Sequence, residues 1–166
     1  MAIWHPAWAG WSAGRPGLQL AFGFAGFAAL FGGALAVQAA LTRRRGALRV
    51  PATAADLWLQ VAFYAVNGPV EEAFFRGLVQ GGLGMLSVPA AGFAIATIAY
   101  VLYHRLGRWA WPDVFATALV GVPLGLAYLL LPGPPSILGV SIAHVGATCG
   151  YLGVGPWLLR RSGWPR

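Results

Sequence analysis

Two adjacent glutamates and an arginine interrupt an apolar run, in the stretch GPVEEAFFRG at residues 68–77. The chain has only four acidic residues, so two of them side by side in apolar surroundings need a physical reason. Glu72 and Arg76 are four residues apart, so on a helix they share a face and can pair. Glu71 points about 100° away and has no cation at that spacing. We therefore predict a structural Glu72–Arg76 pair and a Glu71 that is free for chemistry.

Two of the three histidines can join Glu71 in a catalytic group. His104 follows Tyr100 by four residues and His144 precedes Thr148 by four, so each pair shares a helix face. One carboxylate and two imidazoles are enough to activate a water molecule and to stabilise an oxyanion. The same three side chains could instead hold Zn²⁺.

Plainer interpretations of these residues exist. The Glu72–Arg76 pair could fasten helices within a bundle, His104 could lie at the membrane interface, and His144 could hydrogen-bond a neighbouring helix. None of these explains Glu71. The catalytic interpretation depends on all these residues meeting in one small bundle.

The composition defines the setting in which these groups must meet. The chain has 166 residues, of which 58% are hydrophobic and only 9% charged, whereas soluble domains carry about 25% charged residues. This predicts an all-α polytopic membrane protein, a bundle of about five transmembrane helices in a single domain. The single cysteine, Cys149, excludes an internal disulfide and a cysteine metal cluster.

Five apolar runs are each long enough, or nearly so, to cross a hydrocarbon core of about 30 Å. Their approximate bounds are 18–41, 57–85, 88–104, 114–131 and 137–159. Residues 18–160 therefore form the bundle, with the chemical motifs in about 57–159. The Trp-rich segment 1–17 is predicted to lie in the membrane interface, and 161–166 to be a short basic tail.

The net charge of +7 comes from eleven arginines without any lysine. The arginines stand at the ends of apolar runs, so they indicate membrane topology, and no nucleic-acid partner is expected. Clusters follow the first, third and fifth runs: Arg43, Arg44, Arg45 and Arg49; Arg105 and Arg108; and Arg160, Arg161 and Arg166. Five spans place all three clusters on one side, which the positive-inside rule makes cytoplasmic, with the N-terminus outside. The absence of Lys, with abundant Arg, Ala, Gly and Trp, indicates a bacterial cytoplasmic membrane.

The helix that bears Glu71 is predicted to kink or break at Pro69, which lacks a backbone donor and disfavours helix at Gly68. Asn67 could then cap the second half. Glu71 would lie near a helix N-terminus, where the positive potential favours a carboxylate.

The predicted spans leave the two histidines at different depths. His104 lies near the cytoplasmic boundary and His144 about two turns from the outer end of the fifth span, a separation of more than ~10 Å. Either the third span extends past Arg105, or the outer ends of the last two spans lie deeper than drawn.

The stretch PVEEAFFRG resembles EExxxR, the first motif of the CPBP family of intramembrane endopeptidases, which includes the type II CAAX prenyl proteases. YVLYH is similar to the second motif, FxxxH, with Tyr100 replacing Phe. SIAHVGAT is similar to the third, HxxxN, with Thr148 replacing Asn. The resemblance covers about residues 69–150.

The resemblance implies glutamate-dependent hydrolysis of a peptide bond within the membrane. By position, Glu71 would be the general base, His104 would orient the water, and His144 would stabilise the oxyanion. Glu72 and Arg76 would be the supporting pair, and Thr148 would offer a hydroxyl where the family has an amide. We expect no cofactor, with zinc on Glu71, His104 and His144 as the open alternative.

The implied substrate is a membrane-associated protein or peptide, such as a C-terminal sorting segment, a leader peptide or a CAAX-like tail. Two other functions stay open. A non-catalytic membrane immunity or scaffold protein is favoured by the replacement at Thr148. A small transporter or metal-binding subunit would use the carboxylate and histidines as ligands.

Overall fold

The computed structural model describes residues 7–45, without the Arg45 side chain, and residues 50–164. In these ranges every regular element is a helix, and the one β-type contact is an isolated bridge between Trp11 and Ser136. The elements are η1 (Ala7–Ala9), α1 (Pro16–Arg45), α2 (Ala54–Glu72), η2 (Ala73–Gly81), α3 (Gly82–Leu86), α4 (Pro89–Tyr103), α5 (Trp111–Ala116), α6 (Ala118–Leu130), α7 (Leu138–Tyr151) and α8 (Val154–Arg161). The predicted all-α class is confirmed.

Three helical stretches of the described chain are long and apolar enough to cross a membrane: Pro16–Arg44, Trp111–Leu130 and Leu138–Arg161. Pro89–Tyr103 is also apolar but shorter. The remaining predicted span corresponds to the run α2–η2–α3, which contains the charged residues Glu71, Glu72 and Arg76. Large apolar side chains on its surface, such as Leu59 and Phe63, point outward, as expected for helices surrounded by lipid.

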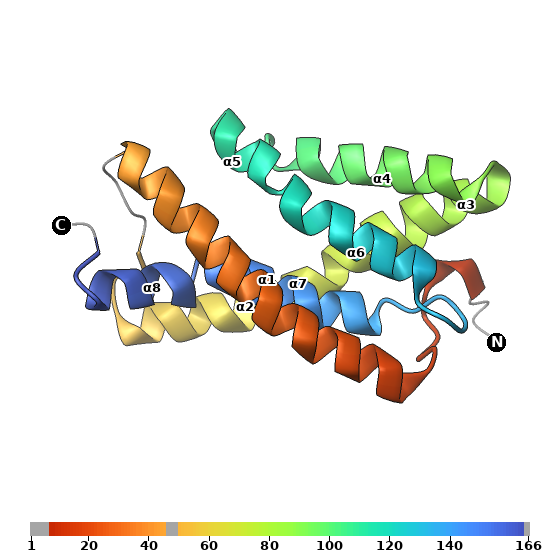
Figure 1. The fold of residues 1–166 in the computed structure, drawn as a ribbon, viewed down its shortest axis with the longest axis horizontal. Coiled ribbons are helices and arrows are strands. Elements are labelled where there is room, and N and C mark those ends of the chain that lie inside the picture. The colour runs from red at the N-terminus through yellow and green to blue at the C-terminus, as the bar shows by residue number, and fades with distance from the viewer. Residues whose placement is uncertain (1–6, 46–49, 165–166) are drawn as a thin grey trace.

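The helices run back and forth along the long axis of the molecule (Figure 1). The end of α1 and α8 lie at the same end, so the described arginines of the first and last clusters lie there, whereas the α4–α5 connection lies nearer the middle of the long axis. The guanidinium of Arg43 lies 3.9 Å from the ring centroid of Trp164, which joins α1 to the C-terminal segment. His5, Arg49 and Arg166 lie outside the described residues.

Helices α1 and α7 make the most extensive packing contact of the bundle, and glycines permit it. A Cβ atom at Gly146 would overlap the carbonyl oxygen of Phe27, and one at Gly150 would overlap that of Phe31. Small residues at such crossings let two backbones approach within a bilayer, where close packing replaces the hydrophobic effect. This contact fixes α7, and with it His144, against the long first helix.

The segment before α1 closes the opposite end of the bundle. The Tyr128 hydroxyl donates to the Trp8 carbonyl at 2.6 Å, and the Ile137 amide donates to Gly10 O at 3.0 Å. These bonds tie the segment to the end of α6 and the start of α7. Its predicted position in the membrane interface stays a prediction, and residues 1–6 lie outside the described chain.

The predicted break at Pro69 is wrong. Helix α2 continues through Pro69 to Glu72, and Asn67 lies inside it instead of capping a second helix. Gly68 packs against Val145 of α7, and such tertiary contacts outweigh a local preference against helix. The irregularity follows the proline as a nine-residue π-helix, η2, whose wider turns continue the same helical run. Glu71 is therefore not near a helix N-terminus.

The fifth predicted span is interrupted, because α7 ends at Tyr151 and α8 begins at Val154. Gly153 lies in the break, with φ −101° and ψ −95°. A Cβ atom there would lie 3.1 Å from Cε2 of Tyr64, so the break makes room for the ring of Tyr64.

Candidate active site

Glu72 lies at the centre of a buried polar cluster. Its Oε2 accepts a hydrogen bond from Arg76 Nε at 3.2 Å, and neither side chain is exposed. Its Oε1 lies 2.7 Å from Nδ1 of His144, which comes from α7. Arg76 also donates to the carbonyl of Gly121 at 3.0 Å. The predicted Glu72–Arg76 pair is thus present, and it holds α2, α6 and α7 together.

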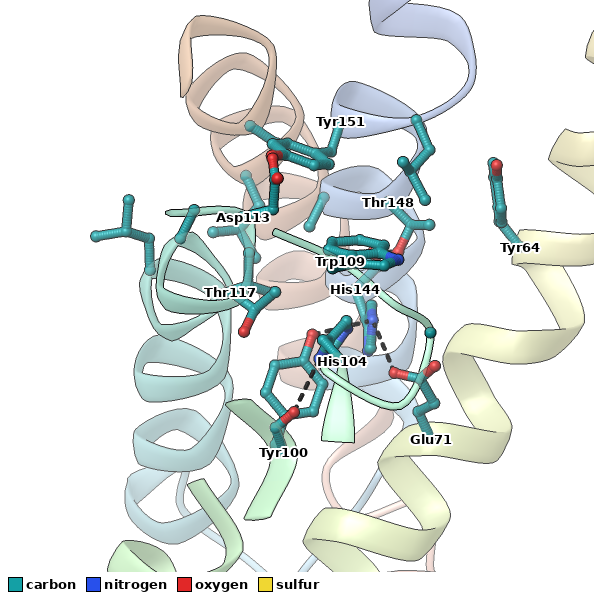
Figure 2. Close-up of a pocket in the computed structure, with 18 of the residues that line it drawn as sticks. Tyr64, Glu71, Tyr100, His104, Trp109, Asp113, Thr117, His144, Thr148 and Tyr151 are labelled. Atoms are coloured by element: carbon teal, nitrogen blue, oxygen red, sulfur yellow. Dashed lines mark hydrogen bonds and ion pairs between the residues drawn. The ribbon is translucent and has the colours of Figure 1, made fainter. Parts of the chain in front are cut away.

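Glu71 turns towards a cavity beside this cluster (Figure 2). Its Oε1 accepts a hydrogen bond of 2.7 Å from Nδ2 of Asn67, one turn earlier. Its Oε2 is buried, has no hydrogen-bond partner, and lies 3.6 Å from Nε2 of His144. Buried polar atoms are normally satisfied, so an unpartnered carboxylate oxygen marks a position for a water molecule or a substrate group.

His144 is oriented by its contact with Glu72. An ionised carboxylate can only accept, so Nδ1 carries the hydrogen and Nε2 is the nitrogen that faces the cavity. The hydroxyl of Tyr100 lies 3.4 Å from Nε2. The imidazole therefore presents one nitrogen to the space next to Glu71.

His104 follows the last residue of α4 and lines the same cavity. Its Nδ1 lies 2.8 Å from the carbonyl oxygen of Tyr100, which requires Nδ1 to be the donor. Its ring packs edge-on against Tyr100 and Trp109, with centroids 4.8 and 5.0 Å away. The Tyr100 ring also meets the His144 ring, at 5.7 Å.

The rings of His104 and His144 both contact Tyr100, so the two histidines lie at a similar depth, contrary to the separation that the predicted spans implied. Helix α4 ends at Tyr103, so the third span does not extend past Arg105. Instead, α7 brings His144 to the level of His104.

Thr148 also lines the cavity, one turn after His144. Its hydroxyl donates to the backbone carbonyl of His144 at 3.2 Å, not to the imidazole. In this position the hydroxyl is already satisfied by its own helix.

The cavity has a volume of about 650 Å³ and is lined from α1, α2, α4, α5, α6 and α7. Its walls are mostly apolar, and its polar groups include Glu71, His104, His144 and Thr148 (Figure 2). Cavities of this size hold ligands as large as a short peptide segment. A substrate group in this space would meet the carboxylate and both imidazoles.

A protein-family model, Type II CAAX prenyl endopeptidase Rce1-like, matches residues 51–149, more than half of the chain. The chain belongs to this family. No curated protein and no solved structure matched it. The matched region runs from just before α2 almost to the end of α7, so it contains every candidate site residue.

Membership of the Rce1-like family makes the chain a member of a protease family embedded in membranes, which acts on membrane-associated proteins. The apolar helices agree with that environment. The individual roles of Glu71, His104 and His144 are not part of this finding and stay predictions.

The possible zinc ligands do not converge as a metal site requires. In the described part of this Rce1-like chain, no three His, Cys, Asp or Glu side chains form a group that could hold a metal ion. We therefore route no step through a metal, and metal independence stays a prediction.

Two residues near the site were missed from the sequence, and a third, Asn67, was predicted only as a helix cap. Asn67 holds Glu71, Gln80 donates to the Gly125 carbonyl at 2.8 Å, and Trp109 covers His104. The spacing could have indicated Asn67 and Gln80, since Asn67 precedes Glu71 by four residues and Gln80 follows Arg76 by four, and residues four apart share a helix face. No spacing indicated Trp109, because its position depends on the turn after α4.

Proposed function

We propose that this chain is an intramembrane endopeptidase in which Glu71 activates the attacking water. The observation that supports it most is the unpartnered Oε2 of Glu71 in the cavity, 3.6 Å from the Nε2 of His144. A carboxylate beside an oriented imidazole has the two functions that peptide hydrolysis needs, a proton acceptor and an oxyanion donor.

In the proposed reaction a water molecule binds at Oε2 of Glu71, and the bare Nε2 of His104 helps to orient it. Glu71 takes a proton from the water as its oxygen bonds to the carbonyl carbon of the scissile peptide. The Nε2–H of His144, present when the ring carries its second proton, donates to the oxyanion. The carbon–nitrogen bond then breaks, and Glu71 returns the proton to the leaving amine.

Glu72 and Arg76 act only through His144 in this scheme. Glu72 holds Nδ1 of the imidazole, and Arg76 balances the charge of Glu72. The Thr148 hydroxyl has no catalytic role in this scheme, because it donates to the backbone carbonyl of His144 within α7.

The proposed substrate is a membrane-associated protein with a C-terminal sorting segment, a leader peptide or a CAAX-like tail. The mostly apolar cavity and the family both favour a lipid-embedded peptide over a soluble one. We further propose a bacterial cytoplasmic membrane, with the arginine-rich end of the bundle in the cytoplasm.

The test is to map protein termini in membranes that contain the wild-type chain or Glu71→Gln. New termini in membrane proteins are expected with the wild type and not with the variant, at equal amounts of the two proteins. Termini that appear equally with both would exclude Glu71 as the base and would favour the non-catalytic scaffold function.

A further inference from the structure

The inner face of α2 has a row of polar side chains that the proposed mechanism does not use. Gln60 donates to Oδ1 of Asp56 at 3.1 Å, and the hydroxyl of Tyr64 donates to Oε1 of Gln60 at 3.2 Å. Asn67 and Glu71 continue the row with their own hydrogen bond. The intervals of three and four residues keep all five on one helix face.

A second face of α2, about 100° from this row, is apolar and exposed. Leu59, Phe63 and Val66 are 72%, 62% and 66% exposed, whereas Tyr64 is only 9% exposed. The α2 helix therefore presents hydrocarbon outward and hydrogen-bonding groups inward. Polar side chains inside a membrane are costly, and those that are kept face the interior of the bundle or a water-filled cavity.

The row joins the cavity to the arginine-rich end of the bundle. Tyr64, Asn67 and Glu71 line the cavity wall. Asp56 lies in the first turn of α2, at the end of the molecule where α8 also lies (Figure 1). The hydroxyl of Tyr64 bonds outward to Gln60, so this side chain connects the cavity to the outer part of the row.

We propose that this row, from Asp56 through Gln60, Tyr64 and Asn67, is the route by which water reaches Glu71 from the arginine-rich surface. The inference deepens the proposed function and rests on it, since the proposed hydrolysis consumes water at Glu71. One feature supports it independently of the row: the buried Oε2 of Glu71 has no hydrogen-bond partner, so it can bind a water molecule. Tyr64 is then the narrow point of the route.

The test measures water access and does not depend on catalysis. Cys149 is the only cysteine, so Cys149→Ala gives a thiol-free background. Single cysteines replace Gln60, Tyr64 or Asn67 in this background. Each has a matched control one residue earlier, Leu59, Phe63 or Val66, at nearly the same depth but on the lipid face. The cationic thiol reagent MTSET is added to the protein in lipid nanodiscs, and labelling is followed by mass spectrometry.

We expect labelling at positions 60, 64 and 67 on the order of tenfold faster than at the controls, because the reagent attacks a thiolate and thiolates form in water. Equal labelling of both faces, or none on the inner face, would overturn the route. A Tyr64→Cys protein that fails to accumulate leaves the pairs 60/59 and 67/66 to decide. Cleavage by the wild type and Glu71→Gln is measured separately, so that fast inner-face labelling without Glu71-dependent cleavage is recognised as a failure of the proposed function alone.

Discussion

Glu72 shows how one buried carboxylate can serve both structure and chemistry. It accepts from Arg76 on its own helix and from His144 on α7, and none of the three side chains is more than slightly exposed. Removing one partner of a buried pair leaves the other charged and unsatisfied, which typically costs 3–5 kcal/mol.

Glu72→Gln is therefore expected to lower the free energy of unfolding by about 3–5 kcal/mol. It would reduce activity as well, since His144 loses the acceptor for Nδ1. Thermal unfolding in detergent measures the first effect. Glu71→Gln is the matched control, with a loss below about 1 kcal/mol because its amide can still accept from Asn67. Equal melting temperatures for Glu72→Gln and the wild type would contradict the buried cluster.

Thr148→Val tests how much the threonine hydroxyl contributes to the cleavage rate, at the position where the family motif HxxxN has Asn. The hydroxyl is bonded to the His144 carbonyl, so its removal is expected to lower the cleavage rate by no more than about fivefold, the value of one ordinary hydrogen bond. Initial rates on a mapped substrate peptide measure it. A loss of two orders of magnitude would mean that the hydroxyl acts on the imidazole or the substrate during the reaction.

At the scale of the helices, the boundaries expected from the local sequence differ from those that tertiary packing produces at two places. Pro69 predicts a kink or a break, yet α2 continues through it without a break, and the irregularity appears as the π-helix η2. Gly153 interrupts a run that reads as one apolar span. Neither could be predicted, because each depends on a contact with another helix: Gly68 against Val145, and Tyr64 beside Gly153.

The α1–α7 contact predicts a large difference between two glycines. Gly146→Ala is expected to prevent normal accumulation in membranes, since the new Cβ would overlap the Phe27 carbonyl. Gly32→Ala in α1 meets nothing within 4 Å and should be neutral or stabilising by up to about 1 kcal/mol. Immunoblots of membrane fractions and melting temperatures compare the two. Similar behaviour of both variants would contradict the close helix crossing.

For the whole molecule, the sequence predicted the helical class and a membrane-spanning bundle, but three described helical stretches, not five, are long and apolar enough to cross a membrane. The site was predicted in part. The spacing of Glu72 and Arg76 indicated their pair, because both lie on one helix. The contact of Glu72 with His144 could not be predicted, since it spans 72 residues of sequence and depends on how α2 and α7 pack.

The proposed orientation makes a prediction for the whole molecule. A green fluorescent protein fused to the C-terminus should fluoresce in bacterial cells, because the arginine-rich end is cytoplasmic. Alkaline phosphatase inserted in the turn at residues 132–135, at the other end, should be active. A dark C-terminal fusion together with an inactive phosphatase insertion would contradict the proposed orientation and indicate the reverse one.

The measurement that tests the central claim most directly is the cleavage rate of the purified protein in nanodiscs, on a peptide that contains a mapped site. Glu71→Gln should lower the rate by about 10²–10⁴-fold, the usual contribution of a general base, with an unchanged melting temperature. A Glu71→Gln protein that cleaves the peptide within a few-fold of the wild-type rate would contradict the account.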